Sequence, residues 1–355
     1  MPDAVNGAER LRLAADLAGT ARWKHWGPYV ALRQWGTVRE DYTANGDAWN
    51  GFPHEHARSR AYRWGEDGLA GICDRWQHLC FGLALWNGND PILKERLFGL
   101  TNSQGNHGED VKEHWWPLDS TPTHSWMRWL YRYPQAAFPY DMLVAENARR
   151  DRSEPEYELV DTGVLDDNRF FDVEVTYAKA GPDDLCIQIR CTNRGPESAT
   201  LHLLPTLWFR NTWSWGRHDA RPVLTAVDRV TIAAQHRLLG DRWLRCSHDP
   251  TLLFTDNDTD TAALYGVPNT AAYVKSGIND HVVHGQETVN PDLTGTKASA
   301  WYVLALEPGE TAVRTLRLSD QAPTPDALEF DAVVAARRAE ADAFYAGLLP
   351  AGAEA

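Results

Sequence analysis

Hydrophobic and polar side chains alternate most clearly in the middle of the chain. In residues 171–177 (FDVEVTY) every odd-numbered residue is apolar and every even-numbered one is polar, and residues 185–191 repeat this pattern. A period of two is typical of a strand with one buried face. Turns at Gly181–Asp184 and Asn193–Pro196 separate these segments from each other and from a third apolar segment, 201–209. This spacing predicts an antiparallel β-sandwich or barrel.

Other segments extend the predicted sheet. Short apolar runs bounded by turns predict strands at Leu79–Leu85 and Ile92–Leu100. Late in the chain, residues 298–306 and 311–318 flank the turn sequence EPGE, and we expect them to form a hairpin. The fold class is therefore mainly β.

Two helices are expected at the ends of the chain. Residues Ala8–Arg22 place leucine and alanine at helical spacing, which predicts a short amphipathic helix. The alanine-rich segment 326–348 predicts a second helix, with Thr324 as its N-cap and Pro325 in its first turn.

Tryptophan is unusually frequent, with 16 residues against 12 tyrosines and 10 phenylalanines. An indole ring offers a flat apolar face and one N–H donor. A carbohydrate site needs such faces, because a sugar ring has an apolar C–H side to stack and hydroxyl groups to hydrogen-bond. An aromatic-rich core explains the same count equally well.

The charge balance excludes some partners. With 35 basic and 49 acidic residues the net charge is −14, whereas a nucleic-acid binder is expected to carry a basic stripe. The same sign disfavours an anionic membrane surface. The first thirty residues contain no apolar run of signal-peptide type, and no stretch approaches eighteen apolar residues. We therefore expect a cytoplasmic protein without nucleic-acid or membrane partners.

No metal or cofactor site is predicted. The five cysteines are widely spaced and lack a CxxC pair, which favours buried free thiols. His54-Glu55-His56 offers two imidazoles, but spacing supplies no third ligand. Residues 256–260 begin like a calcium loop but lack its glycine and its final glutamate, which favours a carboxylate-rich turn. Phosphate-binding and nucleophile-elbow motifs are also absent from the sequence.

Acidic pairs stand among aromatic and basic residues at Glu40-Asp41, Glu66-Asp67 and Glu109-Asp110. Glycoside hydrolysis uses two carboxyl groups across the scissile bond, but ion pairs with neighbouring arginines explain these pairs more simply. Residues 101–119 read as a long polar loop, which we expect to form an interface or a ligand wall.

Several long segments resemble one family, the bacterial glucosidases of the glycoside hydrolase family 63 type, related to mannosyl-oligosaccharide glucosidase. The resemblance covers nearly the whole chain, and its segments are residues 23–49, 56–74, 90–135, 203–216, 273–285, 289–291 and 295–300.

The resemblance implies a particular domain arrangement. Members of that family carry an amino-terminal β-sandwich, a linker helix and an (α/α)6 barrel that holds the catalytic Asp and Glu of an inverting reaction. By that comparison, residues 1–22 form an amino-terminal helix, 23–320 the sandwich and 321–355 the start of the linker, and the barrel is absent. We therefore expect no catalytic residue in this chain. The alternatives are a stand-alone carbohydrate-binding or assembly module and a complete small hydrolase using an acidic pair of its own.

The resembling segments supply candidate site residues. Those with the chemistry to bind an α-glucoside or oligosaccharide are Trp35, Arg39, Glu40, Asp41, Tyr42, Trp49, His54, Arg60, Trp64, Glu66, Asp67, His107, Glu109 and Asp110. We expect an exposed face for the barrel, in cis or in trans, around Trp115, Trp116, Trp126 and Trp129. Such a face also predicts self-association of the isolated chain.

Overall fold

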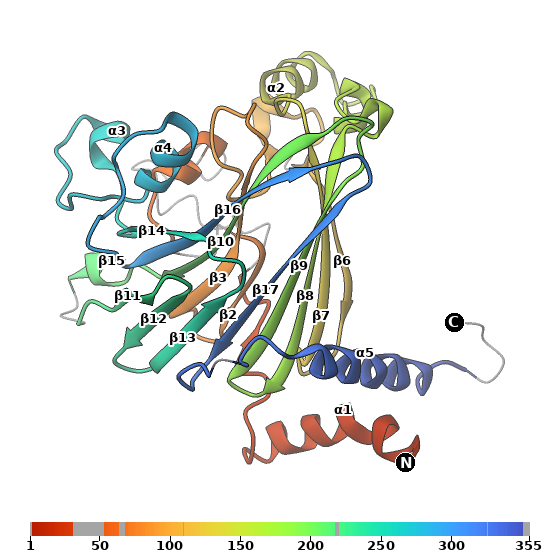
Figure 1. Ribbon diagram of the computed structural model, residues 1–355. Helices are drawn as coiled ribbons and strands as arrows, with labels where there is room; N and C mark the ends of the chain where they lie inside the picture. Colours follow the sequence, from red (N-terminus) through yellow and green to blue (C-terminus); the bar gives the residue numbers. More distant parts are fainter. Residues whose placement is uncertain are drawn as a thin grey trace.

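The computed structural model describes residues 2–30, 53–63, 68–108, 110–216, 220–324 and 326–350 (Figure 1). The α-helices in these ranges are α1 (Pro2–Leu17), α2 (Tyr140–Arg149), α3 (Thr261–Tyr265), α4 (Gly277–His284) and α5 (Asp331–Ala346). The strands are β1 (Trp26–Gly27), β2 (Leu69–Asp74), β3 (Leu79–Trp86), β4 (Gly99–Leu100), β5 (Asp110–Val111), β6 (His114–Ser120), β7 (Trp126–Pro134), β8 (Phe170–Gly181), β9 (Asp184–Asn193), β10 (Ala199–Phe209), β11 (Val223–Asp228), β12 (Thr231–His236), β13 (Gly240–Cys246), β14 (Thr251–Thr255), β15 (Thr294–Gly295), β16 (Lys297–Leu306) and β17 (Thr311–Ser319).

These strands confirm the mainly β, antiparallel fold class. Within the described ranges, one sheet has six strands in the order β1-β2-β3-β10-β16-β14, and a second has nine in the order β15-β11-β12-β13-β17-β9-β8-β7-β6. A separate small hairpin joins β4 and β5, and all pairings are antiparallel. Helices α1 and α5 lie at one end of the sandwich and α4 packs on the outer face of the six-stranded sheet, so the helices of the described residues form no barrel (Figure 1).

The two large sheets pack face to face, so the architecture is a β-sandwich. One apolar core contains side chains from both of them. The six-stranded sheet contributes Phe81, Leu203 and Ala300, and the nine-stranded sheet contributes Ile187 and Leu316. Burial of this shared core is the main stabilising contribution to the sandwich.

The predicted alternation is confirmed in β8 and β9. Their odd-numbered apolar residues 171–177 and 185–191 all lie in the sandwich core. On the opposite face, Glu174 lies 3.0 Å from Arg128 on β7, so polar side chains pair across strands there. The turn at Gly181–Asp184 lies between these two strands, as predicted.

The predicted hairpin of residues 298–306 and 311–318 is wrong. Both segments are strands, but β16 pairs with β10 and β14, whereas β17 pairs with β9 and β13 of the other sheet. The EPGE turn therefore carries the chain from one sheet to the other. Asn193 fixes this crossing, because its side chain donates to the carbonyl of Leu306 (2.9 Å) and its backbone N–H to that of Glu310 (3.0 Å).

The segment Ile92–Leu100 was predicted as a strand but is mostly irregular. It makes one isolated bridge, Lys94 with Leu85, before the short β4. Its apolar side chains enter different clusters: Leu93 packs outside the six-stranded sheet, Leu97 enters the sandwich core, and Phe98 packs near α2. An apolar run divided among several clusters cannot lie along one sheet.

The segment 101–119 is also not a continuous loop. It contains a 3-10 turn at Asn102–Gln104, then β5 and most of β6. Because β6 pairs along β7 with Trp115 opposite Tyr131, the last third of the predicted loop is a strand of the nine-stranded sheet.

Both terminal helices differ from their predicted bounds. Helix α1 begins at Pro2 and ends at Leu17, where Gly19 adopts a left-handed φ of 70° that closes the helix. Helix α5 begins at Asp331, so Thr324 does not cap it. Thr324 instead donates to the Asp326 carboxylate at 2.6 Å, and Pro325 lies outside the described residues.

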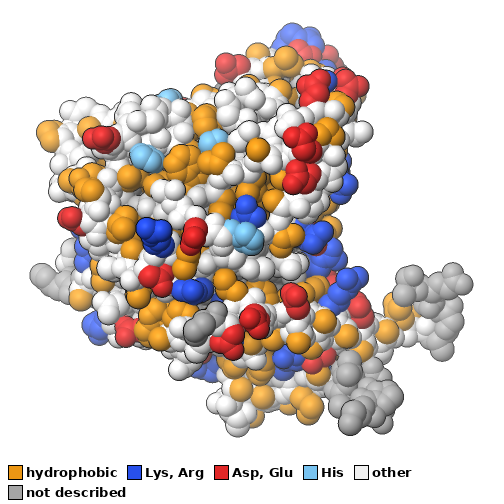
Figure 2. Space-filling view, in the orientation of Figure 1, with side chains coloured by type: hydrophobic (Ala, Val, Ile, Leu, Met, Phe, Trp, Pro, Cys, Tyr) orange, Lys and Arg blue, Asp and Glu red, His pale blue; other side chains and the backbone are white. Residues whose placement is uncertain are grey.

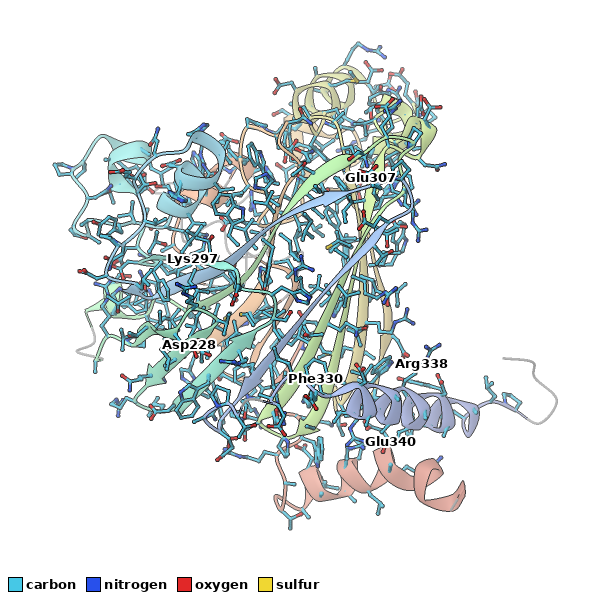
Figure 3. All side chains as sticks on the ribbon, viewed as in Figure 1. Asp228, Lys297, Glu307, Phe330, Arg338 and Glu340 are labelled. Carbon is cyan, nitrogen blue, oxygen red and sulfur yellow. The ribbon has the colours of Figure 1, made fainter. Side chains whose placement is uncertain are left out.

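Helices α1 and α5 lie side by side at one end of the sandwich (Figure 1). Glu340 points from α5 toward α1 (Figure 3) and forms an ion pair with Arg12. The buried Glu9 of α1 accepts hydrogen bonds from the backbone N–H (2.7 Å) and hydroxyl (2.9 Å) of Thr123. Buried polar contacts thus attach α1 to both α5 and the sandwich.

Two further expectations concern cysteines and membranes. All five cysteines are buried and unbridged, which confirms the prediction of free thiols. Among the described residues, none of the helices has the length and apolar content that a membrane crossing requires. On the face in Figure 2, hydrophobic side chains gather around β16 and α4.

Candidate functional site

The six-stranded sheet places buried polar side chains on the face opposite the sandwich core. Along β10 and β16, Leu207 and Ala298 point into the core, so their neighbours Thr206 and Lys297 point outward. The Thr206 hydroxyl lies 2.8 Å from that of Ser299 on the paired strand. The sheet is therefore the floor of a polar site.

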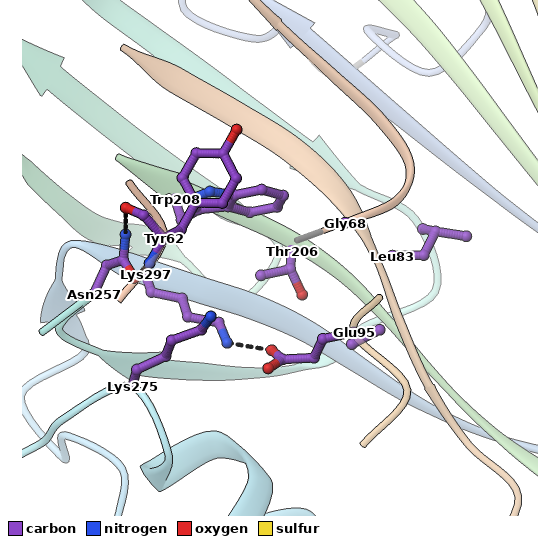
Figure 4. A pocket seen from close by; sticks show the side chains of 10 residues that line it. Tyr62, Gly68, Leu83, Glu95, Thr206, Trp208, Asn257, Lys275 and Lys297 are labelled. Atoms are coloured by element: carbon purple, nitrogen blue, oxygen red, sulfur yellow. Dashed lines mark hydrogen bonds and ion pairs between the residues drawn. The ribbon is translucent and has the colours of Figure 1, made fainter. Parts of the chain in front are cut away.

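A pocket lies on this floor (Figure 4). Chain segments that are far apart in the sequence meet there. The lining residues are Tyr62, Gly68, Leu83, Ala84, Glu95, Thr206, Trp208, Asn257, Lys275 and Lys297.

Two glycines make room for the indole ring in the pocket wall. A Cβ atom at Gly82 would lie 3.1 Å from Cη2 of Trp208 and 3.0 Å from Cα of Gly68. Gly68 has a φ of 100°, and a Cβ there would lie 3.0 Å from the same indole atom. Larger residues at either position would displace Trp208.

Three charged side chains line the pocket. Glu95, Lys275 and Lys297 are all buried, and Lys297 forms an ion pair with Glu95 through Oε1 (Figure 4). Among the described residues, the other oxygen, Glu95 Oε2, has no hydrogen-bond partner, and neither has the Trp208 indole nitrogen. Buried polar groups are almost always hydrogen-bonded, so these two atoms are exceptions that make the pocket a candidate site.

Asn257 holds the pocket wall to the sheet. Its side-chain oxygen accepts from the backbone N–H of Tyr62 at 2.9 Å, and its amide donates to the carbonyls of Tyr62 (3.1 Å) and Phe209 (2.8 Å). The neighbouring acids are also used within the fold: Asp258 accepts from the Trp213 indole at 2.9 Å, and Asp260 caps α3. These contacts agree with a carboxylate-rich turn rather than a calcium loop.

The pocket presents donors and acceptors together. The ammonium groups donate, the free carboxylate oxygen accepts, and Trp208 supplies both an N–H group and an aromatic wall. The described lining carries one carboxylate against two ammonium groups. A small polyhydroxylated ligand matches this set, because each hydroxyl group both donates and accepts.

Of the predicted site residues, His54 is described but does not line the pocket. It is buried, its Nε2 lies 3.3 Å from the Arg96 carbonyl, and its ring packs on Phe98 and Tyr140. Burial and the nearby charges of Lys94 and Arg96 hold the pKa of His54 well below its usual range. A neutral, enclosed imidazole of this kind supports the wall rather than contacting a ligand.

Arg60 lies beside the pocket wall, whereas His107 and Asp110 lie elsewhere. Arg60 donates to the Tyr265 hydroxyl at 2.8 Å. His107 Nε2 lies 3.1 Å from the Glu154 carbonyl in an exposed loop, and Asp110 lies on β5, 3.0 Å from Lys112. The fold therefore does not bring these residues together.

Asp110 belongs to a carboxylate cluster with Glu156 and Glu158 that has the spacing of metal ligands. The Lys112 ammonium lies 3.0 to 3.1 Å from an oxygen of each of the three carboxylates. This ammonium supplies the positive charge that the cluster needs.

Ten predicted site residues lie outside the described residues. They are Trp35, Arg39, Glu40, Asp41, Tyr42, Trp49, Trp64, Glu66, Asp67 and Glu109. Their role in binding remains a prediction.

The four tryptophans predicted for an interface have different environments. Trp126 is only 2% exposed and donates to Asp119 at 2.8 Å, so it cannot belong to an exposed face. The rings of Trp115 and Trp129 lie 5.8 Å apart and pack against the sandwich core. Trp116 alone of the four is exposed, at 40%.

The lysines, Glu95 and Trp208 of the pocket were not among the predicted site residues. A signal for Lys297 existed, because it opens the apolar strand sequence KASAWYVLAL at a position whose neighbour Ala298 is buried. A charged residue next to a core-facing residue of such a strand points to the opposite face of the sheet. There it indicates a functional group or one with an oppositely charged partner. Lys275 lies in the turn before α4, and Glu95 lies in the irregular segment before β4. Neither segment has a periodic pattern that would distinguish these residues.

Comparison with known proteins gives one close sequence match. No family model matches the chain. An uncharacterized protein of Saccharomyces cerevisiae, YMR196W, is 39% identical over 390 residues, which cover 96% of this chain and 36% of the yeast protein. The chain thus spans about a third of the length of this curated relative.

Solved structures align only weakly with this chain. A polysaccharide lyase aligns with a TM-score of 0.30 and 12% identity, over 70% of this chain and 26% of its own. A putative aldose 1-epimerase from Escherichia coli K12 aligns with a TM-score of 0.27 and 8% identity, over 74% of this chain and 81% of its own.

Proposed function

We propose that this chain is the sugar-binding β-sandwich of a larger carbohydrate-active enzyme of the family 63 glucosidase type. In that enzyme it binds a glucosyl unit and braces a catalytic barrel, in cis or in trans. The observation that carries the proposal is the enclosed pocket in which Glu95 keeps one oxygen without a partner among the described residues.

The origin of the lining residues supports this proposal. The segments that resemble the glucosidases at 56–74, 90–135 and 203–216 supply Tyr62, Glu95 and Trp208. Two more, 273–285 and 295–300, supply Lys275 and Lys297. Segments that resemble the glucosidases therefore supply several of the residues that line the pocket.

The pocket chemistry favours binding over hydrolysis by this chain alone. Glycoside hydrolysis requires two carboxyl groups on opposite sides of the scissile bond. The described pocket lining has one carboxyl group, Glu95, which forms an ion pair with Lys297. A single carboxyl group accepts hydrogen bonds from hydroxyl groups but does not supply the pair that hydrolysis needs.

Titration calorimetry with methyl α-D-glucoside and maltose tests the proposal. We expect binding by the purified chain, and about tenfold weaker binding by Glu95→Gln, because a charge-assisted hydrogen bond to a hydroxyl is lost. Glu197→Gln is a matched control, since the Glu197 carboxylate is 72% exposed and lies outside the pocket. Lys275→Met provides a second pocket variant whose folding is checked by circular dichroism.

A glucose-release assay separates the alternatives. We expect no turnover of α-linked glucosides by the isolated chain. Turnover that is lost in Glu66→Gln or Glu109→Gln would favour a complete small hydrolase instead. Equal sugar binding by the wild-type chain, Glu95→Gln and Lys275→Met would contradict the assignment of the pocket.

A further inference from the structure

Two cysteines face each other on neighbouring strands of the six-stranded sheet. Cys73 on β2 and Cys80 on β3 are direct partners in the antiparallel register. Their neighbours Ile72 and Phe81 point into the sandwich core, so both thiols point to the outer face of the sheet. Both cysteines are fully buried there. Among the described strands, no other two cysteines are cross-strand partners.

The backbone hydrogen bonds place this pair where cross-strand side chains come closest. The carbonyl of His78 accepts from the backbone N–H of Arg210 at 3.0 Å, so His78 and, two residues later, Cys80 turn their backbone groups toward β10. The backbone N–H two residues after Cys73 donates to the His25 carbonyl at 2.8 Å, so Cys73 turns its own groups toward β1. The two cysteines therefore form a non-hydrogen-bonded pair. The Cα atoms of such a pair lie about 4.5 Å apart, within the range that a disulfide spans.

The two thiols also contact each other. Burial and a hydrogen bond with the Cys80 thiol raise the pKa of Cys73 well above its usual range, so Cys73 keeps its proton. The Cys80 sulfur lies 3.9 Å from the Gln77 carbonyl, which holds it at the start of β3. Both sulfurs are therefore already positioned for a bond between them.

One row of residues connects the thiols to the pocket of Figure 4. Cys80 is the cross-strand partner of Trp208 on β10, and Trp208 is the partner of Lys297 on β16. Trp208 packs in one apolar cluster with both cysteines, and it lines the pocket together with Lys297. Because a Cβ at Gly82 would lie only 3.1 Å from the indole ring, the ring has little free space. A displacement of the Cys80 side chain is therefore passed on to Trp208.

We propose that Cys73 and Cys80 form a reversible disulfide in the folded chain, with a peroxide as the oxidant, and that this bond moves Trp208 in the pocket wall. The proposal goes beyond the proposed function, because it stands on the thiols and the indole ring and does not require that the pocket binds sugar.

The reaction transfers two electrons from the thiols to hydrogen peroxide. The Cys80 sulfur attacks one peroxide oxygen, the O–O bond breaks, and hydroxide leaves with the Cys80 proton as water. The Cys73 sulfur then attacks the resulting sulfenic sulfur: the S–S bond forms, the S–O bond breaks, and a second water leaves with the Cys73 proton. A dithiol reductant reverses the oxidation by thiol–disulfide exchange. Because both thiols are buried, we expect oxidation over minutes to hours.

Mass spectrometry of the oxidised, unreduced chain tests the bond. Trypsin cuts after Arg75, so the disulfide joins two peptides that separate after treatment with dithiothreitol. We expect this linked pair after exposure of the folded chain to hydrogen peroxide. Cys191→Ala, at a buried cysteine without a cysteine partner, should retain the link. Cys80→Ala should lose it, and Cys73→Ala should lose it and stop at an oxidised Cys80.

Nuclear magnetic resonance of the indole N–H groups tests the movement of the pocket wall. The Trp208 signal, assigned by its loss in Trp208→Phe, is expected to shift on oxidation and to return on reduction. The signal of Trp116, on the other sheet, should stay in place. Circular dichroism checks that the cysteine variants remain folded. Absence of the linked peptides in the wild-type chain, or a linked wild-type chain whose Trp208 signal does not move, would overturn the proposal.

Discussion

At the scale of single residues, Asp183 joins the amino-terminal segment to two strands of the sandwich. Its Oδ1 lies 2.7 Å from His25 Nδ1 and accepts hydrogen bonds from the Trp26 indole (3.1 Å) and Arg242 (3.4 Å). Burial alone would raise the pKa of Asp183, but the hydrogen bond with His25 and the charge of Arg242 lower it from 3.8 to about 2.

This lowered pKa predicts a pH-dependent contribution to stability. Because the folded pKa is below the unfolded one, the ionised Asp183 stabilises the fold above about pH 4, and this contribution is lost as the pH falls toward 2. We expect Asp183→Asn to lower the free energy of unfolding by about 2 kcal/mol at pH 7. Urea titrations at several pH values measure the difference, which should shrink toward zero near pH 2.

Asp167→Asn is the control for this experiment, because the Asp167 carboxylate is 77% exposed. We expect it to change stability by less than about 0.5 kcal/mol at every pH. A wild-type-minus-variant difference for Asp183→Asn that is constant from pH 7 to pH 2 would refute the electrostatic explanation.

Alanine substitutions at two glycines are expected to have opposite effects on stability. At Gly82 a Cβ would approach Cα of Gly68 at 3.0 Å, so we expect Gly82→Ala to destabilise the chain by about 1 to 3 kcal/mol and to weaken sugar binding in the pocket. Gly7 lies inside α1 with nothing within 4 Å of a Cβ, so Gly7→Ala should stabilise by up to about 1 kcal/mol. Thermal unfolding and calorimetry measure both effects, and a stable, fully binding Gly82→Ala would contradict the close packing of the pocket wall.

At the scale of elements, periodicity predicted which segments are strands but not which strands pair. Residues 171–177 and 185–191 were correctly assigned because one face of each is buried and the other is polar. The same signal gave β16 and β17 correctly as strands and wrongly as a hairpin, since a short turn joins paired and unpaired neighbours alike. Pairing depends on contacts such as Asn193 with Leu306, which have no local signature.

Buried polar contacts attach helix α1 to the rest of the fold. Glu9 is 1% exposed and accepts from Thr123, from the Ser125 hydroxyl at 2.8 Å and from Arg12 at 3.2 Å. Removing this carboxylate leaves its donors buried without a partner. We expect Glu9→Ala to lower the free energy of unfolding by about 3 kcal/mol and to speed hydrogen exchange in both α1 and α5.

Arg10→Ala is the matched control for Glu9→Ala, since Arg10 lies on the exposed side of the same helix. We expect it to leave exchange in α5 unchanged. If Glu9→Ala accelerated exchange in α1 but not in α5, the two helices would not depend on one another.

At the scale of the whole molecule, the candidate site could be predicted only in its general nature. The excess of tryptophan and the resembling segments pointed to carbohydrate, but they selected His107 and Asp110, which the fold separates from the pocket. Lys297 points outward from β16 of the six-stranded sheet. Glu95 and Lys275 reach the same face from the irregular segment before β4 and from the turn before α4. That meeting is a property of the tertiary fold, which residue chemistry along the chain does not reveal.

The overall fold also determines which apolar surface is exposed to a partner. Exposed apolar side chains lie on β6, at Trp116 (40%) and Leu118 (42%), and just after α5, at Leu348 (56%) and Leu349 (44%). These two elements meet, because the Tyr345 hydroxyl on α5 donates to the carbonyl of Ser120 on β6. Among the described strands, β6 is also the edge of the nine-stranded sheet.

An edge strand next to apolar side chains predicts self-association of the isolated chain. We expect light scattering to give a mass that rises above 39.9 kDa with concentration. The double substitution Leu118→Glu with Leu348→Glu should return it to the monomer value by placing charges on both elements. Val160→Glu, on an exposed side chain of a different surface, should not. A wild-type chain that stays monomeric at high concentration and binds no dye for exposed apolar surface would mean that this edge is too small or too twisted to hold a partner.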